Sequence, residues 1–299
     1  MFKVTENKEI AKSVFFQKIQ APRIARKRKA GQFLVIRKGE MGERIPLTIV
    51  DSDPAEGTVT IIYQVVGKST AELAKVMPGE TVLDVVGPLG LPTHIESFGT
   101  VVGIGGGIGT APLLPIATAI KNGGNRLLSI VGARTKDLLI LEEEMKAISD
   151  TLIVTTDDGS YAKKGFVTTA LQELIDAGEK IDLCIAIGPV PMMRAVAEVT
   201  RPAQIKTVVS LNPIMVDATG MCGACRVTVG GTTKFVCVDG PEFDGHEVDF
   251  KELTLRNRAY LKEEQVAMDR FEHKDGKCAG GKAKAAAPAK ETVTTGGGQ

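Results

Sequence analysis

The spacing of apolar residues divides the chain into two regions that meet near residue 97. Before that point, short runs rich in branched apolar residues recur at 32–36, 58–63 and 81–86, separated by turn residues such as Asp53 and Pro54. Short strands at this spacing are typical of small antiparallel barrels. Residues 1–97 are therefore predicted to form a β-barrel.

After that point, apolar strands alternate with helical segments. Strands are predicted at 101–104, 127–131, 152–155 and 183–187, and helices at 138–148 and 167–177. Such alternation predicts a parallel sheet covered by helices, and this α/β domain is expected to span residues 98–212. The uncharged stretch 101–120 is not predicted to cross a membrane, because five glycines and two prolines interrupt it.

After the α/β domain, three segments of different composition follow. Residues 213–250 form a compact segment that contains three cysteines. Residues 251–271, in which apolar residues are spread among many charges, are predicted to form a C-terminal helix. Residues 272–299 consist largely of Gly, Lys, Ala, Pro and Thr, and this composition predicts a disordered tail.

Charge and composition narrow the classes of partner. The net charge is +1 over 299 residues, so no global electrostatic argument favours nucleic acid or a membrane surface. The first residues lack the apolar core of a signal peptide, so a cytoplasmic location is expected. The basic run at 23–29 is most simply a solvated loop, with docking to an acidic partner as the alternative.

The cysteine segment carries the strongest chemical signal. Cys222, Cys225 and Cys237 lie within sixteen residues, and clustered cysteines without a secretory signal predict metal ligands rather than disulfides. Asp217 stands five residues before Cys222, where its carboxylate can supply a fourth ligand. The spacing resembles plant-type 2Fe–2S loops and favours an iron–sulfur cluster over structural zinc, with free cysteines least favoured. Cys184, in an apolar strand, is expected to be buried.

A glycine-rich loop follows the strand at 101–104 and opens a helix. Glycines let the backbone approach a pyrophosphate, and a helix N-terminus adds free N–H groups and a favourable dipole. The residues concerned are Gly105, Gly106, Gly107, Gly109, Thr110, Ala111 and Pro112. The dinucleotide fingerprint is imperfect, because its third glycine falls on Thr110 and the next strand ends in Arg134 rather than an acidic residue. A turn that needs glycine only for tight packing is the alternative.

Two further loops leave the carboxyl ends of predicted strands, where open α/β sheets bind ligands. One holds Asp157 and Asp158, and the other holds Gly188, Pro189 and Met192. Carboxylate and hydroxyl groups in such loops can hold a ribose. Asp, Gly, Ser and Pro are also ordinary turn residues, so neither loop is specific alone.

Two short motifs in the barrel region suit a diphosphate. The candidates are Arg44, Pro46, Leu47 and Thr48 in the first motif, and Ile62, Tyr63, Gln64, Gly67, Lys68, Ser69 and Thr70 in the second. Arg44 together with the amides and hydroxyls of the second motif can bind phosphate oxygens. A P-loop is excluded, because Ile62 stands where that motif requires glycine. Each motif alone is equally compatible with a simple strand end.

Taken in order, these motifs resemble the ferredoxin–NADP reductase superfamily over nearly the whole chain to about residue 265. The resemblance implies that the barrel motifs bind FAD, that the three loops of the α/β domain bind a nicotinamide nucleotide, and that the cysteines hold a 2Fe–2S cluster. Two branches are most similar: the small subunits of electron-bifurcating NADH-dependent reduced ferredoxin:NADP oxidoreductases, and the electron-transfer subunits of dihydroorotate dehydrogenase. Asp217 favours the first branch, because the second carries cysteine there. Ile187 stands where many reductases have cysteine, which argues against a catalytic thiol near the nicotinamide.

The resemblance implies a subunit that passes electrons between NAD(H), FAD and the cluster to a larger flavin and iron–sulfur partner subunit, through which ferredoxin can be served. No general acid or base is predicted, because the cofactors carry the chemistry. NAD(H) is the expected nucleotide, although Arg134 can accept a 2′-phosphate and argues the other way. The alternatives are a dihydroorotate dehydrogenase subunit and, in a different class, a zinc-stabilised nucleotide-binding module without redox turnover.

Overall fold

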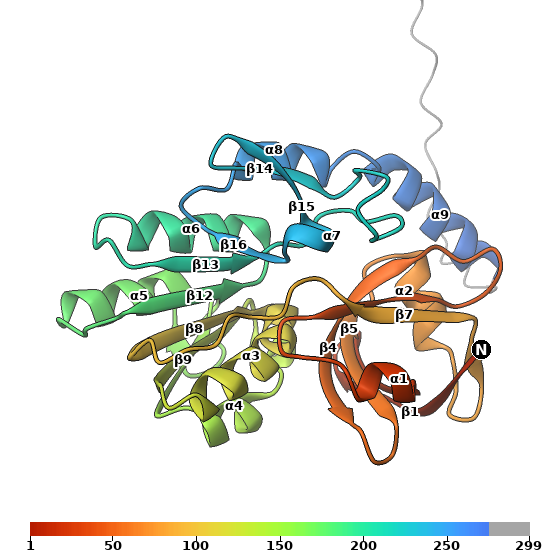
Figure 1. Cartoon of the computed structure of the whole chain (residues 1–299), viewed down its shortest axis with the longest axis horizontal. Coiled ribbons are helices and arrows are strands. Elements are labelled where there is room, and N and C mark those ends of the chain that lie inside the picture. Colours follow the sequence, from red (N-terminus) through yellow and green to blue (C-terminus); the bar gives the residue numbers. More distant parts are fainter. Residues whose placement is uncertain (275–299) are drawn as a thin grey trace, which may run out of the picture.

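The computed structural model describes residues 1–274 and shows two bodies that lie side by side (Figure 1). An antiparallel barrel forms the first body, and a parallel sheet with helices on both faces forms the second. The cysteine segment and the last two helices run along one side of both bodies. The fold class expected from the sequence is confirmed.

The barrel sheet is antiparallel and nearly closed, with the strand order β6-β1-β2-β5-β4-β3-β7. Its strands are β1 (Phe2–Ala11), β2 (Val14–Gln20), β3 (Phe33–Arg37), β4 (Ile45–Asp53), β5 (Thr58–Gln64), β6 (Thr81–Val82) and β7 (Asp84–Leu89), with short helices α1 (Pro22–Ala25) and α2 (Lys68–Ala74). The two edge strands, β6 and β7, are joined by Leu83, whose N–H donates to the Arg37 carbonyl at the end of β3. Alternate residues of the strands, such as Ile49 and Ile61, fill the interior.

The second sheet has the order β11-β10-β9-β8-β12-β13-β16 and is parallel except for β16. Its strands are β8 (Thr100–Gly106), β9 (Arg126–Ala133), β10 (Thr151–Thr156), β11 (Lys163–Lys164), β12 (Leu183–Ile187), β13 (Thr207–Ser210) and β16 (Glu242–Asp244). Helices α3 (Thr110–Asn122) and α4 (Glu142–Ile148) cover one face, and α5 (Val167–Asp176) and α6 (Val190–Thr200) cover the other (Figure 1). The chain proceeds from β8 to β9 and β10 on one side and later to β12 and β13 on the other. The topological switch point therefore lies between β8 and β12.

The helix expected at 138–148 begins later than predicted. Residues 136–138 form a 3₁₀ turn, and α4 begins only at Glu142, after Leu141 in a left-handed conformation with φ 56°. Ile140 gives the reason, because it is buried in one cluster with Val14 and Ile62 of the barrel. Burial between the two bodies outweighs helix propensity here.

The cysteine segment folds as a hairpin that returns to the second sheet. Strands β14 (Arg226–Val229) and β15 (Thr232–Phe235) turn at Gly230 and Gly231, and the short helix α7 (Val236–Asp239) follows. β16 then pairs with β13. Part of the segment 213–250 thus belongs to the sheet of the α/β domain.

The expectation of a single helix at 251–271 is wrong, because the chain forms two helices, α8 (Phe250–Arg256) and α9 (Leu261–Lys274). Asn257 ends α8, and its side-chain amide donates to the Asn212 carbonyl, so the chain turns there. α9 includes residues 272–274, the first part of the expected tail. The rest of that tail, 275–299, lies outside the described residues. Within residues 1–274 no helix combines the length and apolar character needed to cross a bilayer.

Candidate functional site

Two of the predicted nucleotide loops pack against each other, because they follow the neighbouring strands β8 and β12. A Cβ atom on Gly109 would lie 2.2 Å from the Ile187 carbonyl oxygen, and one on Gly106 would lie 2.3 Å from the Met192 sulfur. Both distances are far below van der Waals contact. Close packing therefore explains part of the glycine run.

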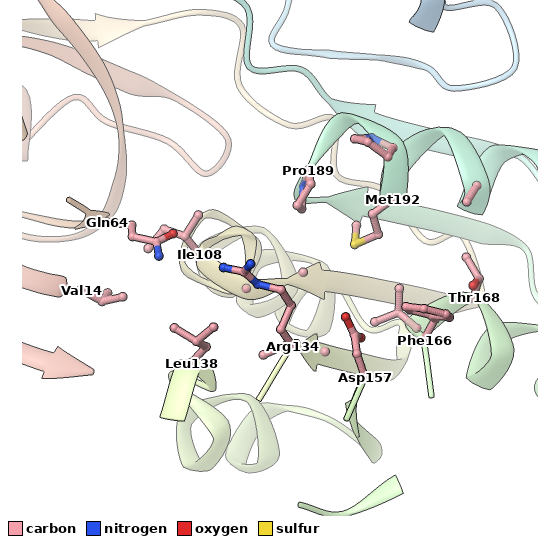
Figure 2. A pocket seen from close by; sticks show the side chains of 17 residues that line it. Val14, Gln64, Ile108, Arg134, Leu138, Asp157, Phe166, Thr168, Pro189 and Met192 are labelled. Carbon is pink, nitrogen blue, oxygen red and sulfur yellow. The ribbon is translucent and has the colours of Figure 1, made fainter. Parts of the chain in front are cut away.

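Gly107 differs from its neighbours. Its φ is +55°, and no atom lies within 4 Å of the position that a Cβ would occupy. It faces a cleft of about 560 Å³, which Figure 2 shows between the two loops, Arg134 and the barrel residue Gln64. Bare backbone that faces an open cleft before a helix of 13 residues fits a pyrophosphate.

The start of α3 contributes both packing and an unsatisfied polar atom. Thr110 is fully buried, and its hydroxyl has no hydrogen-bond partner within the described part of the chain. A Cβ on Gly105 would lie 2.9 Å from Thr110, so Gly105 serves packing. Ala111 is buried between the two bodies, and Pro112 stands in the first helical turn as expected. Thr110 does not line the cleft, so its side chain belongs to the packing at the start of α3.

Opposite charges line the cleft at the ends of β9 and β10. The last residues of these strands are paired in register, so Arg134 and Asp157 leave the sheet at the same level. Burial raises the pKa of the Asp157 carboxyl and the charge of Asp158 adds to this, whereas Arg134 acts in the opposite direction. Hydrogen bonding from Ser160 lowers the pKa of Asp158, whose carboxylate closes its own turn. Asp157 is therefore the carboxylate that lines the cleft.

Phe166 and Thr168 line the end of the cleft away from the barrel and were not predicted from the sequence (Figure 2). Phe166 precedes α5, and Thr168 lies in its first turn. The Phe166 side chain is 60% exposed, which leaves its ring as a flat apolar surface suited to an adenine. A single Phe before a helix carries no signal in sequence, and only its exposure at the cleft reveals it. Pro189 and Met192, which were predicted, line the same cleft.

On the barrel side, β4 presents two faces. Ile45 and Leu47 pack against the barrel interior, whereas Val50 packs against the α/β domain. Because side chains alternate along a strand, Pro46 and Thr48 share the face of Val50. The Leu47 side chain thus belongs to the barrel core, whereas Thr48 lies on the face of β4 that Val50 packs against the α/β domain.

Arg44, at the foot of β4, is an exposed cation with no ion-pair partner within residues 1–274. It lines a second cleft, of about 690 Å³, together with Pro46, the loop at 213–216 and α9. The neighbouring Glu43 accepts a hydrogen bond from Ser69 at the start of α2. The two barrel motifs, far apart in sequence, therefore meet beside this cleft.

The Gly-Lys-Ser-Thr motif begins α2 instead of forming a free turn. The Thr70 hydroxyl accepts hydrogen bonds from the N–H groups of Val66 and Gly67 and donates to the Gly67 carbonyl at 2.9 Å. This hydroxyl thus caps the helix. The Lys68 and Ser69 side chains take no part in the cap, and Ser69 contacts Glu43, the neighbour of Arg44 in sequence.

The strand before that motif contributes mainly by packing. Tyr63 is 2% exposed within the barrel core, and Ile62 is buried against the α/β domain. Gln64, the next residue along the strand, lines the nucleotide cleft. The Tyr63 hydroxyl has no hydrogen-bond partner in the described chain, and burial raises its pKa. The Ile62 and Tyr63 side chains are therefore directed away from a ligand, which leaves only their backbone to contact one.

The four predicted cluster ligands converge in two pairs. The Cys222 thiol donates to Asp217 Oδ1 at 3.2 Å, and the Cys237 N–H donates to the Cys225 sulfur at 3.4 Å. Within the described residues, no three His, Cys, Asp or Glu side chains have the arrangement of a single-metal site. Two pairs of donors are compatible with a centre that has two iron atoms, each held by one pair.

The backbone after Asp217 bends at two glycines, with φ +83° at Gly220 and +67° at Gly223. The hydrogen bond from the Thr219 N–H has the largest effect on the pKa of the Asp217 carboxyl and lowers it, and the Cys222 thiol lowers it further. The Asp217 carboxylate is therefore available as an anion. Its bonds to the N–H groups of Thr219 and Cys222 are those of a turn cap. The geometry thus fits both a ligand and a cap.

Burial raises the pKa of two thiols, those of Cys237 and Cys184. Burial and the neighbouring Cys225 raise the pKa of Cys237 to about 12, so a bound metal centre is needed to hold it as a thiolate. Burial likewise raises the pKa of Cys184 to about 12, and this residue lies in β12 as expected. Cys184 is an inert core residue.

Comparisons with known proteins agree with this arrangement. Residues 212–249 match the iron–sulfur cluster binding domain of dihydroorotate dehydrogenase B, and residues 104–198 match the oxidoreductase NAD-binding domain. An electron transfer subunit homologue of dihydroorotate dehydrogenase B from Thermotoga maritima is 50% identical over 90% of this chain and 94% of its own. The electron transfer subunit of that enzyme from Geobacillus thermodenitrificans is 35% identical, over 82% of this chain and 96% of its own. The chain belongs to this family of electron-transfer subunits.

Solved structures extend the comparison for this family. A structure of an NADH-dependent reduced ferredoxin-NADP oxidoreductase, studied for flavin-based electron bifurcation, contains a chain 49% identical to this one. Its TM-score is 0.86, and the match covers 91% of this chain and 98% of that one. A ferredoxin NADP⁺ reductase from Neisseria gonorrhoeae shares the fold, with 18% identity and a TM-score of 0.54. The match covers 67% of this chain and 89% of the reductase chain. The resemblance to the ferredoxin–NADP reductase superfamily is confirmed, and the chain is an oxidoreductase subunit of that superfamily.

Proposed function

We propose that the chain binds FAD, NAD(H) and a 2Fe–2S cluster, and passes electrons between the nucleotide and a larger partner subunit of an electron-bifurcating NADH-dependent ferredoxin:NADP oxidoreductase. The observation that carries the proposal is the continuity of three sites in one chain. The nucleotide cleft reaches the barrel at Gln64, and the loop at 213–216, which leads to Asp217, lines the cleft of Arg44. When bound, FAD takes two electrons as hydride and releases them singly to the cluster.

The residues of the chain bind and orient these groups. Gly107 and the start of α3 receive the pyrophosphate, with Phe166 and Asp157 at the adenosine end of the cleft. Arg44, with Lys68 and Ser69, holds the FAD diphosphate, and Thr48 faces the flavin. The nicotinamide end of the cleft then lies near Gln64, next to the barrel, where the flavin is placed.

The surroundings of the cluster ligands support a partner subunit. Met221 is 87% exposed and Val238 is 41% exposed, each next to a predicted ligand in sequence. Exposed apolar residues beside a redox centre suit contact with the protein that receives the electrons. The four described cysteines are free, which fits a reducing compartment such as the cytoplasm.

A dihydroorotate dehydrogenase subunit is the second candidate, because relatives at 34–36% identity bear that name. Asp217, where cysteine is expected for that enzyme, favours the first function. Sequence identity does not separate the two, because the Thermotoga maritima homologue of the dihydroorotate dehydrogenase subunit is 50% identical and the ferredoxin-NADP oxidoreductase chain is 49% identical.

We expect NADH to reduce the bound flavin in clear preference to NADPH. Although Arg134 can attract a 2′-phosphate, the partly desolvated Asp157 beside it would repel that group and can accept hydrogen bonds from the ribose hydroxyls. Asp157→Asn should therefore reduce the preference for NADH about tenfold, which corresponds to a change of about 1.4 kcal/mol in relative binding free energy. Anaerobic flavin reduction at several concentrations of each nucleotide measures this ratio.

Asp137→Asn is the matched control, because Asp137 is an exposed carboxylate in the turn after β9 that does not line the cleft. A wild-type preference for NADPH would refute NAD(H) as the nucleotide. An unchanged ratio in Asp157→Asn would show that Asp157 does not face the adenosine ribose.

A further inference from the structure

Glu242 lies where three parts of the chain meet. It stands on β16, five residues after Cys237, and accepts a hydrogen bond of 2.5 Å from the hydroxyl of Thr93. Thr93 belongs to the connection between β7 of the barrel and β8 of the sheet. The third part is Gly31 of the barrel, where a Cβ would lie 2.3 Å from the Thr93 hydroxyl oxygen and 2.8 Å from the Glu242 carboxylate. Gly31 has φ +83°, so both its conformation and its surroundings exclude a side chain.

Backbone hydrogen bonds surround this contact. The Leu91 N–H donates to the Gly240 carbonyl at 2.6 Å, and the Thr93 N–H donates to the Ala30 carbonyl at 2.9 Å. The Leu211 N–H donates to the Pro241 carbonyl at 2.9 Å. The last bond closes the base of the loop 212–240, which contains all four predicted cluster ligands. That loop is therefore joined at its base to the junction at Glu242, while the bond from the Arg256 side chain to the Ala224 carbonyl holds its far part against α8.

Stability alone does not account for a carboxylate at this place. Burial raises the pKa of the Glu242 carboxyl, and the Thr93 hydroxyl counteracts this only in part. Burying a carboxylate is unfavourable even with a partner, and apolar residues of similar size often hold two elements together equally well. A hydrogen-bonded pair has a defined length and direction, which an apolar contact does not impose.

We propose that Thr93 and Glu242 are positioning residues that fix the cluster loop relative to the barrel. Their hydrogen bond sets the distance between the flavin on the barrel and the cluster, and so the rate at which electrons pass between the two. This inference rests on the proposed function. Neither residue lines the nucleotide cleft or the cleft of Arg44, so their action is separate from the binding of NADH and FAD.

Four variants of the full chain test the hydrogen bond itself. Thr93→Val removes the hydroxyl with little change of shape, and Thr93→Ser retains it. Glu242→Leu removes the acceptor, and Glu242→Gln keeps an acceptor oxygen. We expect Thr93→Val and Glu242→Leu to accelerate amide hydrogen exchange at Leu91 and Leu211 about tenfold, as the loss of one hydrogen bond predicts. Thr93→Ser and Glu242→Gln should exchange like the wild type, as should the control Glu247→Ala, which removes an exposed carboxylate of the same segment.

The same variants, with flavin and iron contents verified, are mixed rapidly with NADH. Flavin reduction should proceed at the wild-type rate, whereas cluster reduction should slow about tenfold or more in Thr93→Val and Glu242→Leu, because small displacements of reacting groups have large effects on rates. Faster exchange with unchanged cluster reduction would show a merely structural bond, and unchanged exchange would show that the junction does not depend on it. Either result overturns the proposal. Wild-type protein without flavin or iron would refute the proposed function instead.

Discussion

Replacing Asp217 with Ala should remove most of the iron–sulfur cluster while the flavin stays bound. The structure pairs the Asp217 carboxylate with the Cys222 thiol, so the variant leaves one iron with a single protein ligand. Loss of a metal ligand is among the largest effects of one substitution. Iron analysis and electron paramagnetic resonance of the reduced protein measure the outcome, and flavin absorbance serves as the internal reference.

Two further substitutions separate a ligand from a turn cap. Asp217→Cys should keep a cluster with an altered spectrum and potential, because thiolate is a softer and stronger donor than carboxylate. Asp217→Asn keeps the turn cap, since an Asn oxygen accepts the same N–H bonds, but it should lose cluster content because the ligand charge is gone. Asp239→Ala is the matched control, because Asp239 is a nearby exposed carboxylate that accepts a hydrogen bond from the Phe235 N–H. Wild-type spectra from the Ala, Asn and Cys variants would show that Asp217 is not a ligand.

Arg44→Ala should weaken FAD retention and leave the cluster intact. A charge-assisted hydrogen bond to phosphate contributes about 1.5–3 kcal/mol, which corresponds to a loss of roughly 10- to 150-fold in affinity. The FAD affinity of Arg44→Lys should lie between those of the wild type and Arg44→Ala, because lysine keeps the charge but not the paired N–H groups. The ratio of flavin to protein after dialysis, together with titration of the stripped protein with FAD, measures the effect.

The control for Arg44 is Arg26→Ala, which removes an exposed cation next to α1 and away from the two clefts. Its flavin content should match the wild type. Full flavin occupancy in Arg44→Ala, or an equal loss in Arg26→Ala, would contradict the assignment of Arg44 to the diphosphate.

Much of the fold was predictable because its signals are local. The strand at 183–187 coincides with β12, since five apolar residues in a parallel sheet need no partner information to be recognised. The onset of α4 was not predictable, because Ile140 is withdrawn from the helix by the barrel, a contact between distant parts of the chain. The break at 257–260 depends similarly on Asn257 and its bond to Asn212.

The candidate site shows the same division between local and distant information. The ligand spacing from Asp217 to Cys237 could be read directly, because a metal centre restricts the sequence around it. The individual roles of the glycines could not, since Gly106 and Gly109 meet the neighbouring loop whereas Gly107 faces the open cleft. Phe166 and the contact of Thr93 with Glu242 arise only from tertiary structure and leave no motif.

The absorption spectrum of the purified full-length protein, recorded before and after anaerobic addition of NADH, tests the central claim most directly. We expect flavin bands above a broad iron–sulfur absorption, both of which decrease with NADH, and two iron atoms and one flavin per chain by chemical analysis. A colourless protein that contains one zinc ion per chain and does not respond to NADH would contradict it.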